Sequence, residues 1–318
     1  MAKYEKFGLV NTEKMFSDAL RHGYAVGAFN FYNMETLQSI IAAARDTHSP
    51  VILAVSESAL KYMGDEMLMG MIAGANIKPH EQIALHLDHG HSFESCAHAT
   101  DLGFSSVMID ASNLPIDENI ALTRRVVEYA HKSGVTVESE LGALRGFEDE
   151  NTNSDTGAFT DPADAVKFVS ETGTDSLAIA IGTSHGAYKR KSNTEELRFD
   201  ILQKIATDMP NLPLVLHGAS SIPQNLVDTI NKNGGKLNGA RGIPTDQLIR
   251  AIAMHICKIN VDSDNRLAFT AALREFLSAH PDSFNPRDYL YTAETAVYDN
   301  TIAEIKHIMG SENKVFSN

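Results

Sequence analysis

Short apolar runs recur along this chain, and longer amphipathic segments separate them. We interpret eight of the runs as strands, because they are rich in aliphatic and β-branched residues and too short for buried helices. The segments between them show helical spacing, as in the stripe of Leu37, Ile40 and Ile41 that follows a capping residue, Asn33. The predicted strands are Ala25–Asn30, Pro50–Val55, Ile83–Asp88, Ser105–Asp110, Val135–Leu141, Ser176–Ile181, Pro213–Gly218 and Cys257–Asp262.

The alternation of strand and helix predicts an α/β fold with a parallel sheet, either open and doubly wound or closed into a barrel. Every one of the eight strands has a polar residue at or just beyond its C-terminal end. In an open sheet only strands near the switch in strand order would need one, whereas a barrel gathers all eight ends onto one face. We therefore predict a single (β/α)8 TIM barrel over residues 1–318. The polar residues are Asn30, Ser56, Asp88, His89, Asp110, Glu138, Glu140, His185, His217, Asn260 and Asp262.

Two segments are longer than a barrel connection needs to be. Gly142–Thr160 is rich in Gly, Asp, Glu, Asn and Thr. Connections above about 12–15 residues usually serve a purpose, so we expect a mobile loop that binds or covers a ligand. Gly234–Pro244 leads into an additional helix, which we expect at Thr245–His255.

Composition narrows the class of protein. The chain has 318 residues and a formal net charge of −14. Nucleic acid requires a basic face, so we expect no such partner, although a few local cations can still hold small phosphorylated ligands. Cys96 and Cys257 are too few for a disulfide framework, and we expect them to fill the core. With no signal-peptide pattern and no stretch of about 20 apolar residues, the sequence predicts a cytoplasmic protein that does not enter a membrane.

Three histidines follow three different strands, and each stands directly before a glycine: His89, His185 and His217. A single histidine at a strand end is most often an ordinary polar residue. Three on one barrel rim make a suitable set for Zn²⁺ with an open position for substrate. Glu138 and Glu140 share one face of the fifth strand, and an inward pair of carboxylates indicates a cation or hydrogen-bond donors nearby.

Polar stretches on the last three strands suit a phosphate group. They are His185–Lys189, Gly218–Ser221 and Asn260–Ser263. Many barrels hold phosphate there with backbone amides, a hydroxyl and the start of a helix. Lys258 points inward by parity, and we interpret it as a packed structural lysine, with a Schiff-base role as the alternative.

These residues, in this order, resemble the class II fructose-bisphosphate aldolases, and more closely the shorter branch that also contains the tagatose-bisphosphate aldolases. The resemblance extends from about Ala25 to Arg287. It implies a metal-dependent lyase of glycolysis and gluconeogenesis that cleaves fructose 1,6-bisphosphate reversibly, through a zinc-stabilised enediolate, to dihydroxyacetone phosphate and glyceraldehyde 3-phosphate. The motifs are LDHG (Leu87–Gly90), VESELG (Val137–Gly142), SHGAYK (Ser184–Lys189), LHGASS (Leu216–Ser221) and KINVDSD (Lys258–Asp264).

The resemblance also implies a role for each matched residue. Glu140 would bind zinc in a second, more buried position, and Asp110 would serve an outer-shell or second-metal position. Asp88 would exchange a proton with the aldehyde oxygen, while Glu148, from the long loop, would move protons at the dihydroxyacetone phosphate carbon. The catalytic zinc would lie on His89, His185 and His217.

Substrate contacts follow from the same resemblance. Asn260 would contact the enediolate, and Asn30 and Ser56 are further substrate-binding candidates. The phosphate of the ketone product would lie where the family often also binds a monovalent cation, K⁺ or Na⁺. The residues that match this phosphate site are Gly186, Lys189, Gly218, Ser220 and Ser263.

Three positions bear on the preferred sugar and on assembly. Fructose-specific members of the branch have Asp and Arg at the positions of Asp262 and Arg266, whereas tagatose enzymes tend to have a small residue and a lysine. The resemblance therefore implies a preference for fructose 1,6-bisphosphate. Arg287 matches an arginine that reaches the distal phosphate from a neighbouring subunit, which implies a homodimer or homotetramer.

Three other interpretations compete with an aldolase that uses zinc. A metal-dependent hydrolase on the same barrel usually takes ligands from the first strand, which here offers only Asn30. A Schiff-base aldolase needs an inward lysine near the substrate, and Ala178–Ala180 on the sixth strand has none. A scaffold without catalysis would leave the histidines, the carboxylates and the phosphate-binding stretches without a purpose.

Overall fold

Eight parallel strands close into a barrel in the computed structural model, which describes residues 1–142, 145–146, 158–186 and 196–316. The order around the barrel is β1-β10-β9-β7-β5-β4-β3-β2, so each strand lies beside its neighbours in the sequence and the last closes on the first. The predicted (β/α)8 barrel is confirmed, and all eight predicted strands are present. They are β1 (Val26–Asn30), β2 (Val51–Ser56), β3 (Ile83–Gly90), β4 (Ser106–Ile109), β5 (Thr136–Leu141), β7 (Ser176–Ile179), β9 (Leu214–Leu216) and β10 (Ile256–Val261).

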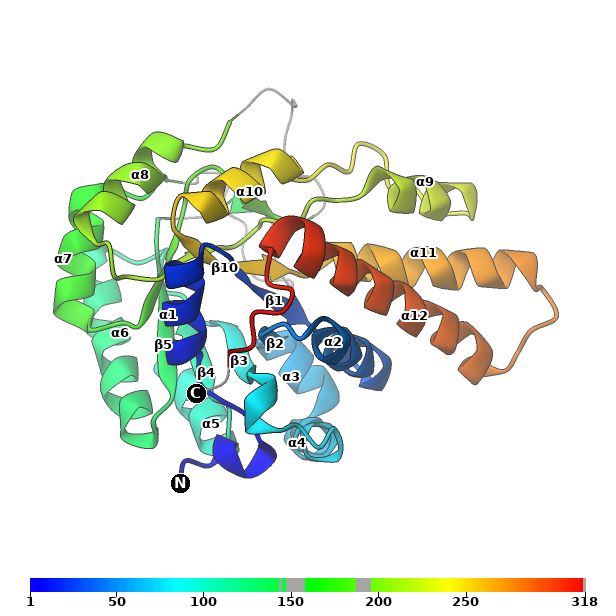
Figure 1. The fold of residues 1–318 in the computed structure, drawn as a ribbon, viewed down its shortest axis with the longest axis horizontal. Coiled ribbons are helices and arrows are strands. Elements are labelled where there is room, and N and C mark those ends of the chain that lie inside the picture. Colours follow the sequence, from blue (N-terminus) through cyan, green and yellow to red (C-terminus); the bar gives the residue numbers. More distant parts are fainter. Residues whose placement is uncertain (143–144, 147–157, 187–195, 317–318) are drawn as a thin grey trace.

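Helices surround the barrel (Figure 1). The predicted cap of α2 is present, since the Asn33 side chain accepts a hydrogen bond from Thr36 N at 3.0 Å. Among the described residues, no helix combines the length and apolar composition that a membrane span requires. The helices are α1 (Thr12–His22), α2 (Met34–Thr47), α3 (Glu57–Met63), α4 (Asp65–Gly74), α5 (Phe93–Leu102), α6 (Ile116–Ala130), α7 (Pro162–Thr172), α8 (Phe199–Asp208), α9 (Gln224–Lys232), α10 (Thr245–Ala253), α11 (Ser263–Ala279) and α12 (Pro286–Glu304).

Two additions fall where the sequence has its long connections. α10 lies where an additional helix is expected, immediately before β10. Within the long loop, β6 (Arg145–Gly146) pairs in parallel with β8 (Ser184–His185), so that Gly146 lies opposite His185. The remainder of the predicted loop, except for residues 142 and 158–160, lies outside the described residues.

Helices α11 and α12 form an arm that extends beyond the other helices of the barrel (Figure 1). α12 begins at the outer end of the arm and returns to pack against α2. A small apolar cluster, which includes Val227, Ile230 and Leu267, joins α9 to α11. Near the outer end, the side chain of Phe284 is 92% exposed. The start of α11 thus belongs to the barrel rim, while its far end stands away from the barrel.

The barrel interior changes character along its axis. Small and aliphatic side chains such as Ala28, Ile52 and Ala84 pack together in one buried cluster inside the barrel. Nearer the C-terminal ends of the strands the inward side chains become polar, and Glu138 and Lys258 are almost completely buried. Because buried polar groups are costly unless they are paired, the contacts of this polar layer determine what the barrel can bind.

A β-bulge near the end of β3 directs two consecutive side chains to the inside. The register against β4 shifts between Leu87 and Gly90, and His89 has a left-handed φ of 47°. Strand alternation alone would place Asp88 and His89 on opposite faces. The extra residue of the bulge removes that restriction, so both side chains are buried at the barrel rim.

Gly90 should be essential to this bulge. A Cβ atom there would lie 2.7 Å from Met108 O and 2.9 Å from Cys96 Sγ. We expect Gly90→Ala to lower the free energy of unfolding by about 1–3 kcal/mol, because of overpacking. Gly70→Ala is the matched control, since nothing lies within 4 Å of its Cβ position in α4. It should be neutral or stabilising. Denaturant unfolding of both variants tests this, and equal stabilities would contradict it.

Candidate active site

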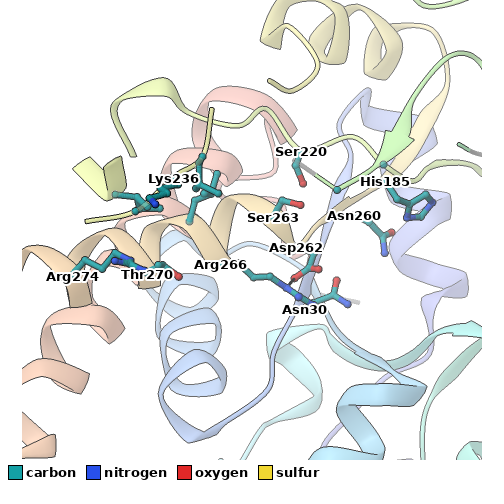
Figure 2. Close-up of a pocket in the computed structure, with 16 residues that line it drawn as sticks. Asn30, His185, Ser220, Lys236, Asn260, Asp262, Ser263, Arg266, Thr270 and Arg274 are labelled. Atoms are coloured by element: carbon teal, nitrogen blue, oxygen red, sulfur yellow. Dashed lines mark hydrogen bonds and ion pairs between the residues drawn. The ribbon is translucent and has the colours of Figure 1, made fainter. Parts of the chain in front are cut away.

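A cavity of about 400 Å³ opens at the C-terminal ends of the barrel strands. His185, Ser220 and Asn260 lie at one end of it (Figure 2). Asp262, the residue before α11, and Arg266, on α11, lie further along the cavity. Asn260 lies on barrel strand β10, and the others lie on segments that follow or adjoin the ends of the barrel strands. The cavity is therefore the candidate site, and its inner end adjoins a cluster of histidines and carboxylates.

Two imidazoles face each other at the centre of the cluster. Nε2 of His89 lies 2.9 Å from Nδ1 of His217. On their outer sides, His89 Nδ1 lies 3.0 Å from Asp110 Oδ2, and His217 Nε2 lies 2.7 Å from Glu138 Oε1. Asp88 completes this group, with Oδ1 at 3.9 Å from His217 Nδ1.

This donor set fits a metal ion. A carboxylate only accepts hydrogen bonds, and a neutral imidazole has a single N–H. Since each of the two rings donates its N–H outward to a carboxylate, the nitrogens that face each other both present lone pairs. Two lone pairs 2.9 Å apart repel each other unless a cation or a shared proton lies between them. The geometry is that of neutral imidazole ligands with carboxylates behind them.

A second group shares His89 with Asp110 and Glu140. Glu140 Oε2 lies 3.9 Å from His89 Nδ1. Burial alone would raise the pKa of Asp110, but hydrogen bonds from His89 and Ser112 outweigh it and hold that pKa well below its ordinary value. Asp110 is therefore anionic and orients His89, while Glu140 lies close enough to His89 and Asp110 to share a cation with them.

His185 stands beside the cluster. Its ring centroid lies 5.0 Å from that of His89 and 6.3 Å from that of His217. In the described part of the chain, the groups whose ligand atoms all come within 4.8 Å of one another do not include it. Its predicted role as third ligand stays a prediction, supported by the nearness of the rings.

Asp88 is held rigidly by two amides from opposite neighbours in the barrel. Asn30 on β1 donates to Oδ2 at 2.8 Å, and Asn260 on β10 donates to Oδ1 at 2.8 Å. In the described structure, the amide oxygens of Asn30 and Asn260 are buried without a hydrogen-bond partner. Both predicted substrate-binding asparagines therefore orient the predicted acid/base, and their oxygens remain able to accept from a ligand.

Beneath the cluster lies a fully buried ion pair. Nζ of Lys258 lies 2.9 Å and 2.8 Å from the two carboxylate oxygens of Glu138. Burial would raise the pKa of Glu138, but Lys258 and His217 outweigh it and lower that pKa. The expected donors beside the inward carboxylates are thus Lys258 and His217. Parity predicts that Lys258 is inward, but sequence reasoning missed this link from Lys258 through Glu138 to His217.

The predicted phosphate contacts gather at one end of the cavity: Gly186, Gly218, Ser220 and Ser263 all line it. A Cβ atom at Gly218 would lie 2.6 Å from the carbonyl carbon of Ser184, so only glycine permits these two loops to approach so closely. Asp264, which the sequence did not single out, accepts hydrogen bonds from Ser221 N and Ile222 N at 2.7 Å each. It fixes the loop that carries Ser220.

Asp262, the residue immediately before α11, forms a pair with Arg266 near the start of that helix. Arg266 Nε lies 2.8 Å from Asp262 Oδ1 and 2.8 Å from the Tyr32 hydroxyl, and its guanidinium stacks on the Tyr32 ring. Burial raises the pKa of Asp262, although Arg266 opposes that rise. Both charged groups line the cavity, so they are placed to contact a polar ligand.

The other predicted residues are less central. Ser56 accepts from Ala59 N and caps α3, and it does not line this cavity. Arg287 is exposed in the first turn of α12, on the outer part of the arm, and is likewise absent from the cavity wall. Glu148 and Lys189 lie outside the described residues.

Comparison with known proteins gives a consistent result. The family model described as fructose-bisphosphate aldolase class-II matches residues 10–314. The chain is 48% identical over 301 residues to the fructose-bisphosphate aldolase of Giardia intestinalis, covering 94% of this chain and 92% of that protein. It is 46% identical over 334 residues to that of Treponema pallidum, covering 99% and 100%. The crystal structure of the YdjI aldolase from Escherichia coli K12 superposes with a TM-score of 0.74 at 28% identity, covering 97% of this chain and 100% of that one. The chain therefore belongs to the class II fructose-bisphosphate aldolase family, whose members are metal-dependent lyases acting on phosphorylated sugars.

Proposed function

We propose that this protein cleaves fructose 1,6-bisphosphate reversibly to dihydroxyacetone phosphate and glyceraldehyde 3-phosphate in the cytoplasm. The observation that carries the proposal is the pair of facing imidazoles, His89 and His217, beside Asp88 at the inner end of the cavity. Relatives of nearly the same length that bear the name fructose-bisphosphate aldolase support it. Tagatose 1,6-bisphosphate is the second candidate substrate, and a metal-dependent hydrolase is less favoured, because Asn30 of β1 is committed to Asp88.

We assign Zn²⁺ to the cluster, on His89, His217 and His185. When bound, the ion supplies Lewis-acid stabilisation of the negative charge that develops on the substrate oxygens as the carbon–carbon bond breaks. The three imidazoles are neutral ligands and leave the charge of the ion undiminished. Glu140 would serve an alternative, deeper position, and Asp110 orients His89 from outside.

Proton transfer falls to the carboxylates. Asp88 is buried beside His217 and is fixed by Asn30 and Asn260, so it is positioned to exchange a proton with the aldehyde oxygen. Glu148 is assigned to the carbon of dihydroxyacetone phosphate from the family resemblance. The phosphate of that ketone would bind at Gly186, Lys189, Gly218, Ser220 and Ser263, together with a monovalent cation, K⁺ or Na⁺.

The distal phosphate requires a cation at the other end of the substrate. Arg266 is one candidate, because it lines the cavity beyond Asp262. Arg287 is the second, donated by a neighbouring subunit, since it is exposed on the outer part of the arm and does not line the cavity of its own chain. A guanidinium suits a phosphate dianion, and its supply in trans would make a homodimer or homotetramer the active form.

Removal of the metal should abolish activity. We expect chelation to stop cleavage, and zinc or cobalt to restore it, because neutral imidazoles cannot replace the Lewis acid. Borohydride added with substrate should not inactivate the enzyme, since Lys258 is buried in its pair with Glu138. A coupled assay of triose phosphate release gives the readout. Covalent trapping of substrate on Lys258 would overturn the assignment.

The two proton-transfer residues should have separable effects. Asp88→Ala should lower kcat for cleavage by about 10²–10⁴-fold, the usual worth of a general acid or base. It should leave exchange of the dihydroxyacetone phosphate proton less affected. Glu148→Ala should slow that exchange, followed by loss of isotope label, with zinc content unchanged. Equal loss of cleavage and exchange in both variants would show that the roles are not separate.

Asp262 should set the preference for the fructose epimer. A carboxylate aimed at one hydroxyl configuration rejects the other, because the wrong epimer leaves a polar group unpaired. We expect Asp262→Ala to reduce the ratio of kcat/KM for the two bisphosphates by about tenfold or more. Asp161→Ala is the control, since it removes an exposed capping carboxylate of α7 outside the cavity wall. Equal turnover of both sugars by the unmodified protein would refute the proposal.

A further inference from the structure

The buried pair of Lys258 and Glu138 needs an explanation other than stability. Lys258 is 0% exposed and Glu138 is 1% exposed. Removing two charges from water costs free energy that their attraction often fails to recover, and apolar residues of similar volume frequently stabilise a core as well or better. No substrate atom can approach Lys258 below the cluster, so it does not act as a nucleophile. Its function must be exerted through its neighbours.

Hydrogen bonding around the pair allows only one arrangement. Lys258 has donors and no acceptor, so it donates to both oxygens of Glu138 and, at 3.4 Å, to Nε2 of His86. His86 must then carry its proton on Nδ1, which donates to Ser106 Oγ at 2.8 Å. Burial and the charge of Lys258 lower the pKa of His86 to about 3, which keeps this ring neutral.

The tautomer of His217 is fixed by Glu138 in a similar way. Glu138 Oε1 lies 2.7 Å from Nε2 of His217 and can only accept, so Nε2 must carry the ring proton. The other nitrogen, Nδ1, is then left with its lone pair directed at the cluster. Because Lys258 donates hydrogen bonds to both carboxylate oxygens, the Glu138 side chain is held in place against the His217 ring.

We propose that Glu138 and Lys258 are positioning residues that fix the tautomer and orientation of His217, so that its Nδ1 is presented to the metal. The inference rests on the metal centre of the proposed function. Gln at position 138 could turn its amide N–H₂ towards Nε2, which would move the ring proton to Nδ1 and obstruct the metal position. Met at position 258 would remove both hydrogen bonds that hold the Glu138 carboxylate.

Zinc affinity, measured by chelator competition without substrate, tests the proposal. We expect Glu138→Gln and Lys258→Met each to weaken zinc binding about 10–100-fold, the usual effect of losing a partner of a metal-binding histidine. The control is Val215→Ala, which removes buried apolar volume inside the barrel, on β9 and two residues before His217. It should reduce thermal stability and change zinc affinity less than about threefold, within the usual scatter of uncoupled sites.

The double variant Glu138→Gln/Lys258→Met separates positioning from stability. It carries no charge at either position, so it should fold even if Lys258→Met alone does not, and its thermal stability without zinc should approach that of the wild type. Its zinc affinity should stay low, and its absorption spectrum with cobalt should differ from that of the wild type. Wild-type affinity and an unchanged cobalt spectrum in the double variant would overturn the proposal.

The zinc-binding measurements do not depend on whether the protein cleaves either bisphosphate. If the wild type bound no zinc, both this inference and the metal assignment would be wrong. If the variants lost zinc as expected but the wild type cleaved neither bisphosphate, the positioning role would stand and the proposed function would fail. Zinc loss in Val215→Ala equal to that in Glu138→Gln would show that only general packing is involved, and would also overturn the proposal.

Discussion

The close approach of two imidazole nitrogens, His89 Nε2 and His217 Nδ1, is the constraint on which the rest of this barrel depends. With the proton of each ring on its outward nitrogen, the two facing nitrogens present lone pairs, and the rings stay this close because each is held from behind. Asp110 holds one and Glu138 holds the other, and each carboxylate in turn needs donors of its own. Every buried polar group needs a hydrogen-bond partner, so the contact at the rim requires carboxylates behind the two rings, and these carboxylates require donors deeper in the barrel. The polar layer inside the barrel follows from this requirement.

Much of the fold could be predicted from the sequence because it depends on local periodicity. Eight short apolar runs separated by helical stripes are sufficient for a barrel once polar residues are found at every strand end. Parity along β5 also places Glu138 and Glu140 on the inside. In each case the informative residues are close together in the chain, so no knowledge of distant contacts is required.

Contacts between distant segments could not be predicted in the same way. The bulge that turns both Asp88 and His89 inward depends on the register between β3 and β4, which no spacing within β3 reveals. The link from Lys258 to Glu138 joins residues 120 positions apart. Asp264, which holds the loop after β9, is similarly remote from the backbone amides it binds. For Glu148 and Lys189 the resemblance to a family remains the whole basis.

Helix α11 joins two tasks that are often separate in enzymes. Ser263 and Arg266 near its start line the cavity, and the whole helix spans 17 residues, roughly 25 Å, to the exposed end of the arm. Because one continuous helix connects the exposed end of the arm with the cavity wall, a tilt of the arm would also move Arg266. The exposed surface of the arm and part of the cavity wall therefore belong to one helix, and neither can change its angle without the other.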